Sequence, residues 1–439
     1  MNADPTPTLP GRPGDPLRGR HIVLGVTGSI SCYKAIEVAS RLVQAGAIVD
    51  IAMTEHAAQF VTPLTFRSLT AREPYLSMWQ PYAGVGEAHV ELARRADAML
   101  IAPATASTLA RLANGLADDQ VSLTALATTT PLLVAPAMDG QMWENPATQA
   151  NVEILKARGV QFIGPAQGRL ASGRMGLGRL VEPERLIEEL RWRLGREHGD
   201  LVGRRIVVSA GGTREPIDPV RYVGNRSSGK MGYAVAEAAR DRGAEAVIVS
   251  TVSLPVPAGV RVVSVESALQ MMEAVHRECA DADALIMAGA VADYRPADAA
   301  EQKIKRDKTG DMSIDLLENP DIIASTPLET KRGRLTKISF AAETQDLIAN
   351  ATAKLAKKGA RFVVANDVSA TDAGFGVDNN RVTILDDAGG RADLPLMPKY
   401  DVGHAILDRV LPLLAPRGEP RVSPQPRGAP REPRTRASD

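Results

Sequence analysis

One pattern occurs twice along this chain: a continuous apolar run, a glycine-containing turn, an amphipathic segment that ends at glycine, and a second apolar run. The first copy begins with HIVLGVTG at 21–28 and ends with AIVDIAMT at 47–54. The second begins with RRIVVSAGGT at 204–213 and ends with AEAVIVS at 244–250. Apolar runs without alternation are typical of parallel strands that are covered on both faces. Each half therefore predicts a doubly wound α/β domain with a parallel sheet.

Further apolar runs follow in each half, separated by segments with helical spacing. They lie at 96–104 and 131–138 in the first half, and at 282–293, 337–343 and 360–368 in the second. We expect two domains, at 19–194 and 195–415, that meet near the polar stretch 193–200. The proline-rich ends, 1–18 and 416–439, are expected to be disordered tails.

The composition argues against several classes of partner. Lys+Arg and Asp+Glu both total 52, and aromatic residues make up 4%, so neither nucleic acid nor an anionic membrane is expected as a partner. The two cysteines, Cys32 and Cys279, are far apart and form neither a metal cluster nor a disulfide framework. No apolar run approaches the ~20 residues that span a bilayer, and the N-terminus lacks a signal-peptide pattern. These features predict a cytoplasmic protein.

The stretch GNRSSGKM at 224–231 is one residue short of a P-loop. The pattern G-x-x-x-x-G-K is complete, but Met231 stands where a P-loop has Ser or Thr. A thioether cannot replace the hydroxyl that holds Mg²⁺, because Mg²⁺ prefers hard oxygen ligands. The residues alone therefore indicate a Gly- and Ser-rich turn at the head of a helix, and not a Walker loop.

Ligands in doubly wound sheets bind beyond the carboxyl ends of the strands, so the turns there are the candidate sites. In the first half, Gly28 and Ser29 either form a phosphate site or belong to a plain tight turn. Thr105 either contributes a hydroxyl or caps a helix. Asp139 is equally compatible with a turn or a cap. The glycine-rich stretch 168–180 is either a linker or a flap that closes a site.

Several motifs of the first half resemble those of flavin-dependent cysteine decarboxylases: GVTGSISCYKA, PATAST, PAMDGQMW and the glycine-rich stretch, in that order. The resemblance implies a flavodoxin-like, trimeric domain with FMN, and it makes His89 a catalytic residue. A lone histidine is otherwise more often structural. A cysteine amide cannot lose its carboxylate directly, and oxidation of its thiol-bearing carbon by a flavin supplies the missing electron sink. The resemblance assigns cofactor binding to Gly28, Ser29, Thr105, Ser107 and Met138.

Two candidate catalytic positions depart from that family. Asp139 stands where many relatives have Asn, and its charge would repel the substrate carboxylate, so we expect it to be neutral or to face a donor. Ser172 stands where some relatives have a cysteine that protonates the product, and a hydroxyl is a much weaker acid than a thiol (Cys pKa ~8.5). Either another group donates the proton or the last reduction is slow.

The second half resembles phosphopantothenate–cysteine ligases through SAGGTREPIDPVRYVGNRSSGKMGYAVA, AVADYRP, QKIK, ENPDII, FAAET and ANDVS. The resemblance implies that CTP activates 4′-phosphopantothenate as an acyl-cytidylate, which cysteine then attacks. Asn225 would contact the acid, Lys303 would stabilise charge, and Asp293 would bind CTP or its Mg²⁺. Without the family, Lys303 belongs to a solvated charge run. The positions implied for CTP are Met287, Ala288, Gly289, Asp293, Lys303, Pro320, Asp321, Ile322, Ile323, Phe340, Lys354 and Lys358.

The order of the two halves resembles bacterial bifunctional proteins of coenzyme A biosynthesis, over about residues 20–410. It implies a carboxy-lyase fused to an acid–amino-acid ligase that makes 4′-phosphopantetheine. By analogy, decarboxylase trimers joined through ligase dimers would form a dodecamer. Two alternatives stay open: an enzyme with one active half, and a non-catalytic flavin-binding regulator. A nicotinamide-dependent oxidoreductase is disfavoured, because G-x-G-x-x-G followed by an acidic ribose ligand is missing.

Overall fold

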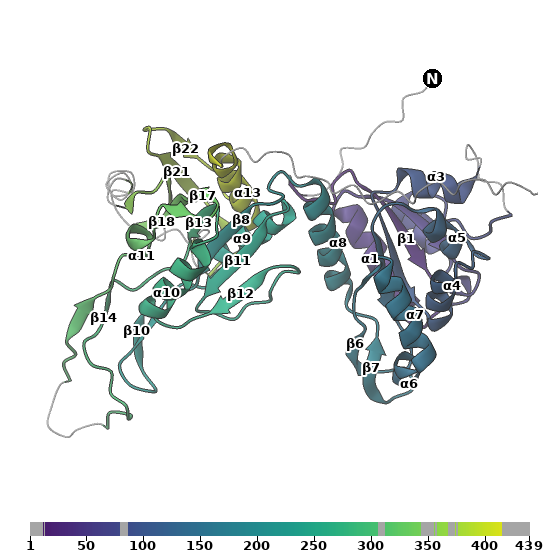
Figure 1. The fold of residues 1–439 in the computed structure, drawn as a ribbon, viewed down its shortest axis with the longest axis horizontal. Coiled ribbons are helices and arrows are strands. Elements are labelled where there is room, and N and C mark those ends of the chain that lie inside the picture. The colour runs from purple at the N-terminus through teal and green to yellow at the C-terminus, as the bar shows by residue number, and fades with distance from the viewer. Residues whose placement is uncertain are drawn as a thin grey trace, which may run out of the picture.

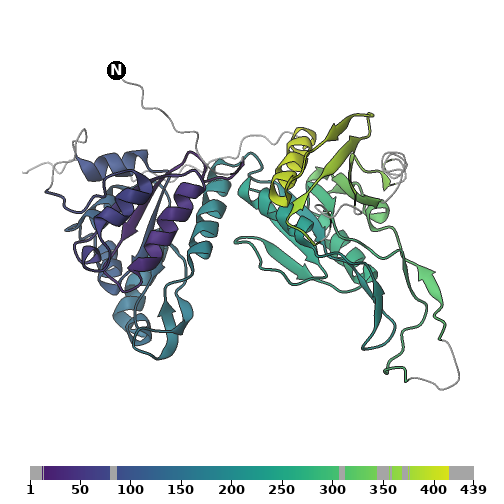
Figure 2. The same cartoon turned by 180° about the vertical axis from the view of Figure 1, so that it is seen from behind.

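The protein consists of two α/β halves with a long helix, α8 (Pro183–His198), between them (Figure 1). The same arrangement is seen from behind in Figure 2. The computed structural model describes residues 12, 14–79, 87–305, 312–343, 355, 358–367, 374 and 376–414. The predicted tail at 416–439 lies outside these residues.

The first half contains a five-stranded parallel sheet in the order β2-β1-β3-β4-β5. Its strands are β1 (His21–Val26), β2 (Ile48–Met53), β3 (Ala98–Ala104), β4 (Leu132–Pro136) and β5 (Gln161–Phe162). This order is that of flavodoxin-like folds, with the strand order reversing between β1 and β3. The helices are α1 (Cys32–Gln44), α2 (Pro63–Thr70), α3 (Ala88–Arg95), α4 (Ala106–Asn114), α5 (Gln120–Ala127), α6 (Gly140–Glu144) and α7 (Pro146–Ala157).

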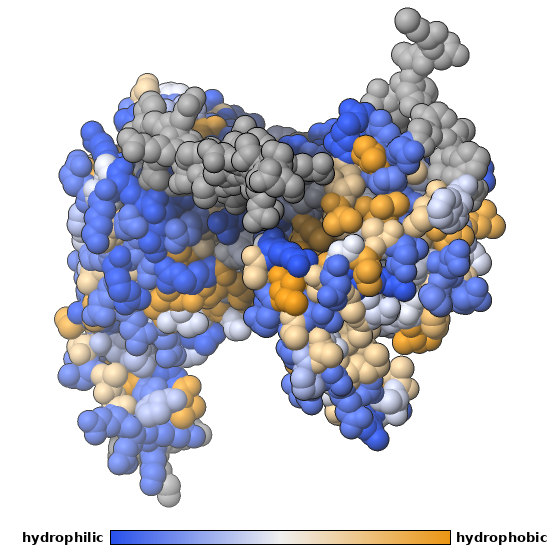
Figure 3. Space-filling view, turned by 45° about the vertical axis from the view of Figure 1, so that its right-hand side comes forward, coloured by the Kyte–Doolittle hydropathy of each residue, from blue (hydrophilic) through white to orange (hydrophobic). Residues whose placement is uncertain are grey.

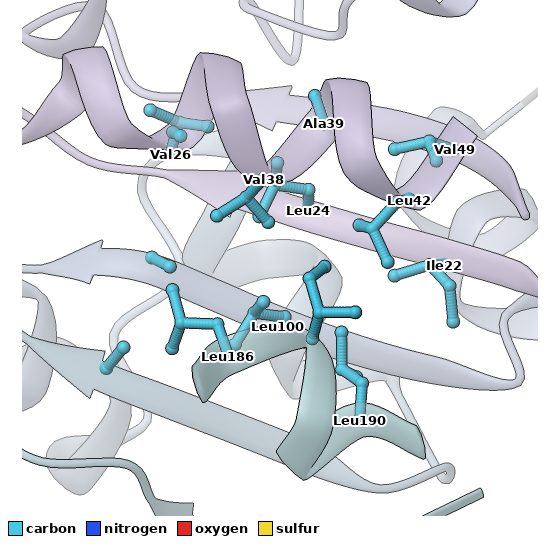
Figure 4. Close-up of a cluster of buried hydrophobic side chains, with 14 of the residues drawn as sticks. Ile22, Leu24, Val26, Val38, Ala39, Leu42, Val49, Leu100, Leu186 and Leu190 are labelled. Atoms are coloured by element: carbon cyan, nitrogen blue, oxygen red, sulfur yellow. The ribbon is translucent and has the colours of Figure 1, made fainter. Parts of the chain in front are cut away.

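Helices cover both faces of this sheet, as the continuous apolar strands require. Figure 4 shows Val38 and Leu42 of α1, and Leu186 and Leu190 of α8, around Leu100 of the central strand. The opposite face is covered by α3, α4, α5 and α7, which form a second cluster of buried apolar side chains. Burial of one such leucine contributes about 1.5–3 kcal/mol to folding.

The second half contains an eight-stranded sheet in the order β12-β11-β8-β13-β18-β19-β21-β22. Its parallel strands are β8 (Arg205–Ala210), β11 (Glu245–Ser250), β12 (Arg261–Ser264), β13 (Ala284–Met287), β18 (Thr336–Glu343) and β19 (Phe362–Asp367). Numbered along the chain, these six have the order 3-2-1-4-5-6 of dinucleotide-binding folds. The two predicted doubly wound domains are therefore confirmed. Two further strands, β21 (Val382–Asp386) and β22 (Arg391–Asp393), extend one edge antiparallel and were not predicted.

Helices also cover both faces of the second sheet. One face carries α9 (Lys230–Asp241) and α13 (Lys399–Val410), and the other carries α10 (Ala268–Cys279) and α11 (Ile322–Ser325). The polar stretch 193–200, where the domains were expected to meet, forms the end of α8 and the turn after it. The two halves meet along α8: Ala258 donates its backbone N–H to Glu188 at 3.2 Å.

The expectation of a disordered tail at 1–18 is wrong for residues 14–18. Leu17 is fully buried in the core beneath α1 and α8. Asp15 accepts hydrogen bonds from Arg191 of α8, with an Nη2–Oδ2 distance of 2.7 Å. Proline-rich composition was a poor guide here, because one apolar side chain and one ion pair are enough to hold a short segment against the fold.

Small antiparallel ribbons extend from the two sheets. In the first half, β6 (Ala166–Arg169) and β7 (Met175–Arg179) form a hairpin. In the second half, β9 (Arg214–Pro216) pairs with β10 (Tyr222–Gly224), and β14 (Tyr294–Pro296) pairs with β15 (Leu316–Glu318) (Figure 1). The shorter pairs are β16 (Glu329–Thr330) with β17 (Gly333–Arg334), and β20 (Asn379–Asn380) with β23 (Met397–Pro398). Short 3₁₀ helices occur at Ala57–Gln59 and Leu411–Leu413.

Apolar surface is exposed in patches on both halves (Figure 3). In the part of the chain that the structure describes, every helix is too short or too polar to cross a bilayer.

Two candidate active sites

Each sheet carries one large cavity at the place where its strand order reverses. The first cavity, of about 580 Å³, lies beyond β1 and β3. The second, of about 550 Å³, lies beyond β8 and β13. This is the position at which parallel α/β sheets bind ligands, because neighbouring loops diverge there and leave a crevice.

All five residues predicted for cofactor binding line the first cavity: Gly28, Ser29, Thr105, Ser107 and Met138. Thr27, which sequence reasoning passed over, joins the two strand ends. Its Oγ1 donates to the Pro103 carbonyl at 2.8 Å and accepts from the Thr105 N–H at 3.2 Å. Thr105 also caps α4, since its side chain accepts from the Thr108 N–H. The two interpretations of Thr105 are therefore compatible.

Gly28 is in close contact with the next loop. A Cβ at this position would lie 2.5 Å from the Cβ of His56, a distance that real side chains do not reach. His56 itself lines the cavity and was missed, because nothing in its sequence context distinguished it. The absence of a side chain at Gly28 thus lets this loop lie against His56 beside the start of α1.

The residues present fit a flavin mononucleotide. The loop before the 13-residue helix α1 brings backbone N–H groups and the Ser29 hydroxyl to one part of the cavity, as a phosphate requires. The remaining wall combines hydroxyl and guanidinium groups with apolar side chains suited to a flat ring. Those apolar residues are Leu76, Met78, Trp79, Ala137, Met138 and Met142.

The predicted catalytic side chains of the first half do not line this cavity. His89 lies on α3, is partly buried, and has its Nδ1 3.9 Å from a Glu87 carboxylate oxygen. Asp139 and Ser172 lie together, outside the residues that line the cavity. A single chain therefore brings together the residues predicted to bind the cofactor but not the residues predicted to react.

The two positions that depart from the decarboxylase family are hydrogen-bonded to each other. Ser172 Oγ, in the turn of the β6–β7 hairpin, donates to Asp139 Oδ2 at 2.7 Å. Asp139 also accepts from the Gln141 N–H as the cap of α6. Ser172, Gln141 and the positive charge of Arg174 hold the pKa of this exposed carboxyl below its usual range. We expected Asp139 either to be neutral or to face a hydrogen-bond donor. In the structure it faces a donor.

The hairpin that contains Ser172 is fastened to the loop after β4. The Met138 N–H donates to the Gly178 carbonyl at 2.9 Å, next to the cavity wall. The glycine-rich stretch 168–180 is thus an ordered ribbon beside the candidate cofactor site.

Most residues predicted for the second half line one cavity. They are Asn225, Met287, Ala288, Gly289, Asp293, Pro320, Asp321, Ile322, Ile323, Phe340 and Lys358. Asp321 caps α11 by accepting from the Ala324 N–H at 3.2 Å, and its Oδ2 lies 4.0 Å from Lys358 Nζ. Lys354 lies outside the described residues. Lys303 is exposed and does not line the cavity.

The GNRSSGKM stretch is a helix start and not a phosphate-binding P-loop. Gly229 has left-handed backbone angles and caps α9, which begins at Lys230. Lys230 does not face the open cavity as a P-loop lysine would. Its Nζ donates to the Gly376 carbonyl at 3.0 Å and to Asp378 Oδ1 at 2.7 Å. Lys230 therefore fastens this loop to the segment at 376–380.

Asn225 is oriented by the strand-end loop of β13. Its Nδ2 donates to the carbonyls of Ala290 and Val291 at 3.3 and 3.1 Å. Gly212, in the turn after β8, does not line the cavity. A Cβ at Gly212 would lie 2.3 Å from the Asn225 carbonyl oxygen, so this glycine lets two loops touch. Its effect on the site is indirect, through the position of Asn225.

The polar residues of this cavity that sequence reasoning did not assign include Asn366, Asn380 and Lys399. Asn366 lies in the quoted motif ANDVS, so the motif itself could have pointed to it. Lys399 follows a short strand and begins α13, where no family motif was quoted. In the described part of the chain, His, Cys, Asp and Glu side chains form no cluster of three that could hold a metal ion.

A flavodoxin-like domain fused to a dinucleotide-binding-type domain, each with a cavity at its strand reversal, defines a class of two-domain flavoproteins. Family comparisons agree: the family described as Flavoprotein matches residues 11–195. The family described as DNA/pantothenate metabolism flavoprotein C-terminal domain matches residues 201–413.

Similar proteins define the family more narrowly. The coenzyme A biosynthesis bifunctional protein CoaBC of Vibrio cholerae is 42% identical over 393 residues, which cover 89% of this chain and 98% of that protein. The Bacillus subtilis protein of the same name is 42% identical over 406 residues, covering 92% and 99%. A crystal structure of the C-terminal domain of such a protein shares 39% identity, covers 49% of this chain and 98% of its own, and has a TM-score of 0.41. The chain belongs to the family of bifunctional coenzyme A biosynthesis proteins.

Proposed function

We propose that the two halves of this bifunctional decarboxylase and ligase perform successive steps. The second half joins cysteine to 4′-phosphopantothenate at the expense of CTP, and the first half removes carbon dioxide from the product with FMN. The observation that carries this proposal is the presence of two separate cavities, one in each half, lined by the residues of the corresponding family motifs.

In the second half, the acid attacks the α-phosphorus of CTP, so that an acyl-cytidylate forms and pyrophosphate leaves. The cysteine amine then attacks the acyl carbon, the acyl–oxygen bond breaks, and CMP leaves with the electron pair. Catalysis of such transfers depends mainly on positioning and charge neutralisation. The loop at Met287–Gly289 and the segment Pro320–Ile323 would hold the nucleotide, while Asn225 would orient the acid.

Charge on the triphosphate requires cations. Lys358 lies on the cavity wall, and Asp293 supplies a carboxylate through which Mg²⁺ bound to the phosphates would be held. Lys303 would have to come from outside the cavity lining, by movement of its exposed segment or from a second copy of the chain. We retain Lys303 as a proposed catalytic residue on this basis.

In the first half, Gly28, Ser29, Thr105, Ser107 and Met138 would hold FMN. When bound, the flavin supplies the reversible two-electron chemistry that stabilises the electron pair left by carbon dioxide. The residues of this chain would bind the substrate beside it, and the β6–β7 hairpin would exclude water. Ser172 would keep Asp139 ionised and turned toward the hairpin.

His89 lies apart from the cavity of its own chain, so we propose that a second copy supplies it. This is consistent with an oligomer of decarboxylase trimers and ligase dimers, and with a cytoplasmic enzyme that acts on small molecules. Because His89 is exposed in part on α3, an adjoining subunit could contact it without rearrangement of the fold.

One assay tests the whole proposal. The purified chain is given phosphopantothenate, cysteine, CTP and Mg²⁺, with FMN bound, and the products are followed by mass. Formation of CMP and 4′-phosphopantetheine is expected. Accumulation of phosphopantothenoylcysteine would mean that the first half is inactive, and a product that is decarboxylated but not reduced would assign the defect to Ser172. If none of these products formed, the proposal would be contradicted.

A further inference from the structure

Three lysine side chains are buried among the described residues: Lys34, Lys337 and Lys399, with 5%, 3% and 4% of their surface exposed. Lys34 forms an ion pair with Glu182. Within the described part of the chain, Lys337 and Lys399 have no carboxylate within ion-pair distance. Burying an ammonium group without a counter-charge costs free energy, so we expect a compensating interaction at each of these positions.

Both lysines donate to pairs of main-chain carbonyls in the second half. Lys399 Nζ donates to the carbonyl of Gly374 at 2.7 Å and to that of Val377. Lys337 Nζ donates to the carbonyl of Ile323 at 2.8 Å and to that of Thr326. Each amine therefore joins two points of one loop, and each loop forms part of the wall of the same cavity.

The wall that Lys399 holds is formed by Gly374 and by the segment at 376–380. The Lys399 N–H also donates to the Asp378 carbonyl, and β20 pairs with β23 directly before α13. From the other side, Lys230 of the GNRSSGKM loop donates to Gly376 and Asp378. Two lysines, at the starts of α9 and α13, thus fasten this segment beside the loop proposed to bind the acid substrate.

The wall that Lys337 holds is the segment at 320–326. Lys337 lies on β18, directly below the short helix α11, whose first residues line the cavity. Asp321 fixes the N-terminus of α11 as a cap, and Lys337 satisfies carbonyls at its C-terminal end. A four-residue helix has little intrinsic stability, so these two contacts determine its position.

We propose that Lys337 and Lys399 are positioning residues for the ligase reaction, and that each fixes the wall for a different substrate. Lys337 positions the nucleotide wall, and Lys399 positions the wall for phosphopantothenate. This inference rests on the proposed function, which assigns CTP to Pro320–Ile323 and the acid to the loop around Asn225. Burial lowers the pKa of both amines, that of Lys399 to about 8.

The test is a comparison of Michaelis constants in the full-length, flavin-loaded enzyme, with CMP release as the signal. Lys399→Met removes both donated hydrogen bonds and should raise KM for phosphopantothenate roughly tenfold, with KM for CTP changed less than about threefold. Lys337→Met should show the reverse pattern. A role limited to folding would lower the amount of active enzyme and leave both KM values unchanged.

Lys34→Met is the matched control, because it removes a buried lysine from the first half. It should lower the melting temperature without altering either ligase KM. If a methionine variant does not fold, the corresponding glutamine variant retains one donor and should show the same selective change, only smaller. Variants that raise both KM values equally, or neither, would overturn the positioning roles. A wild-type enzyme that released no CMP would instead overturn the proposed function itself.

Discussion

The two cavities have the same position in their sheets but differ in what a single chain brings to them. The first cavity is lined by all five predicted cofactor-binding residues, yet His89, Asp139 and Ser172 lie elsewhere. The second cavity is lined by most of the residues predicted for both its substrates, including Asn225 and Asp293. A bound cofactor needs only a fixed crevice, whereas the reacting groups must meet a substrate and can come from another loop or another copy.

The difference lies in how the loops are held. In the second half, Asn225, Lys230 and Lys399 connect the cavity loops to one another through hydrogen bonds. In the first half, Thr27 connects the two loops at the strand reversal, and the hairpin with Ser172 contacts a neighbouring loop instead of the cavity. Under the proposed assignments, one chain therefore brings together most of the residues proposed for ligation, but for decarboxylation it brings together only the residues proposed to bind the cofactor.

The largest expected effect is the loss of the first cavity without damage to the second. In Gly28→Val, the added side chain would collide with His56, so that two loops that line the cavity must move apart. We expect a colourless protein without flavin absorbance or carbon dioxide release, and with unchanged CMP formation. A yellow Gly28→Val protein would show that flavin does not use this crevice, and a parallel loss of CMP would show that the halves are not independent.

His89→Asn should lower carbon dioxide release by about 10²–10⁴-fold, because a proton-transferring group is lost, while flavin absorbance and CMP formation persist. Mixing the His89→Asn variant with the Gly28→Val variant tests whether His89 and the flavin of one site come from different copies of the chain. If one copy supplies His89 to the flavin of another, mixed oligomers should regain a measurable part of the activity. Mixtures without any regained activity would place His89 and flavin in the same chain.

Lys303→Gln should reduce ligation by about 10²–10³-fold, as expected for the loss of one charge-stabilising group. Decarboxylation of supplied phosphopantothenoylcysteine should be unchanged. The measurement is CMP release at saturating substrates, with Lys305→Gln as a control in the same exposed segment. Normal ligation by the Lys303 variant would mean that the second cavity is complete without it.

The smallest expected effect is a pH dependence of the free energy of unfolding, which arises at the junction between the halves. His404 of α13 is buried beside residues 14–16, and burial lowers its pKa from 6.5 to about 4. The unfolded chain therefore binds an extra proton between these pH values, and stability falls as pH drops through this range. Between pH 7 and pH 5, this group alone should cost about 2 kcal/mol.

Urea unfolding of the wild type and of His404→Gln at the two pH values measures this contribution. The carboxylates around the histidine, Asp15, Asp200 and Asp408, are present in both proteins, so the difference between the two pH dependences isolates the histidine. Identical pH dependences would mean that His404 is already protonated, or exposed, in the folded protein.

Much of the site could be predicted because it lies at strand ends. Continuous apolar runs located the strands, and Gly28 and Thr105 follow those strands directly, so topology alone brings them to the first crevice. Asn225 follows the short strand β10, in the insertion between β8 and α9, and lines the second crevice. The near P-loop could also be interpreted correctly as a helix start, because Met231 cannot bind Mg²⁺. Contacts between distant loops could not be predicted, such as that of Lys399 with Gly374 or of Ser172 with Asp139.

By itself, the order of apolar runs and turns predicted two doubly wound domains and the edge of each sheet at which to look for a ligand, while the resemblance to known families assigned individual residues to each crevice. Only the tertiary structure decided which side chains face a crevice and which face one another. The physical reason is that hydrophobic periodicity acts within one strand or helix and is visible locally, whereas Lys230, Lys399 and Asp139 find partners through packing between elements far apart in the chain.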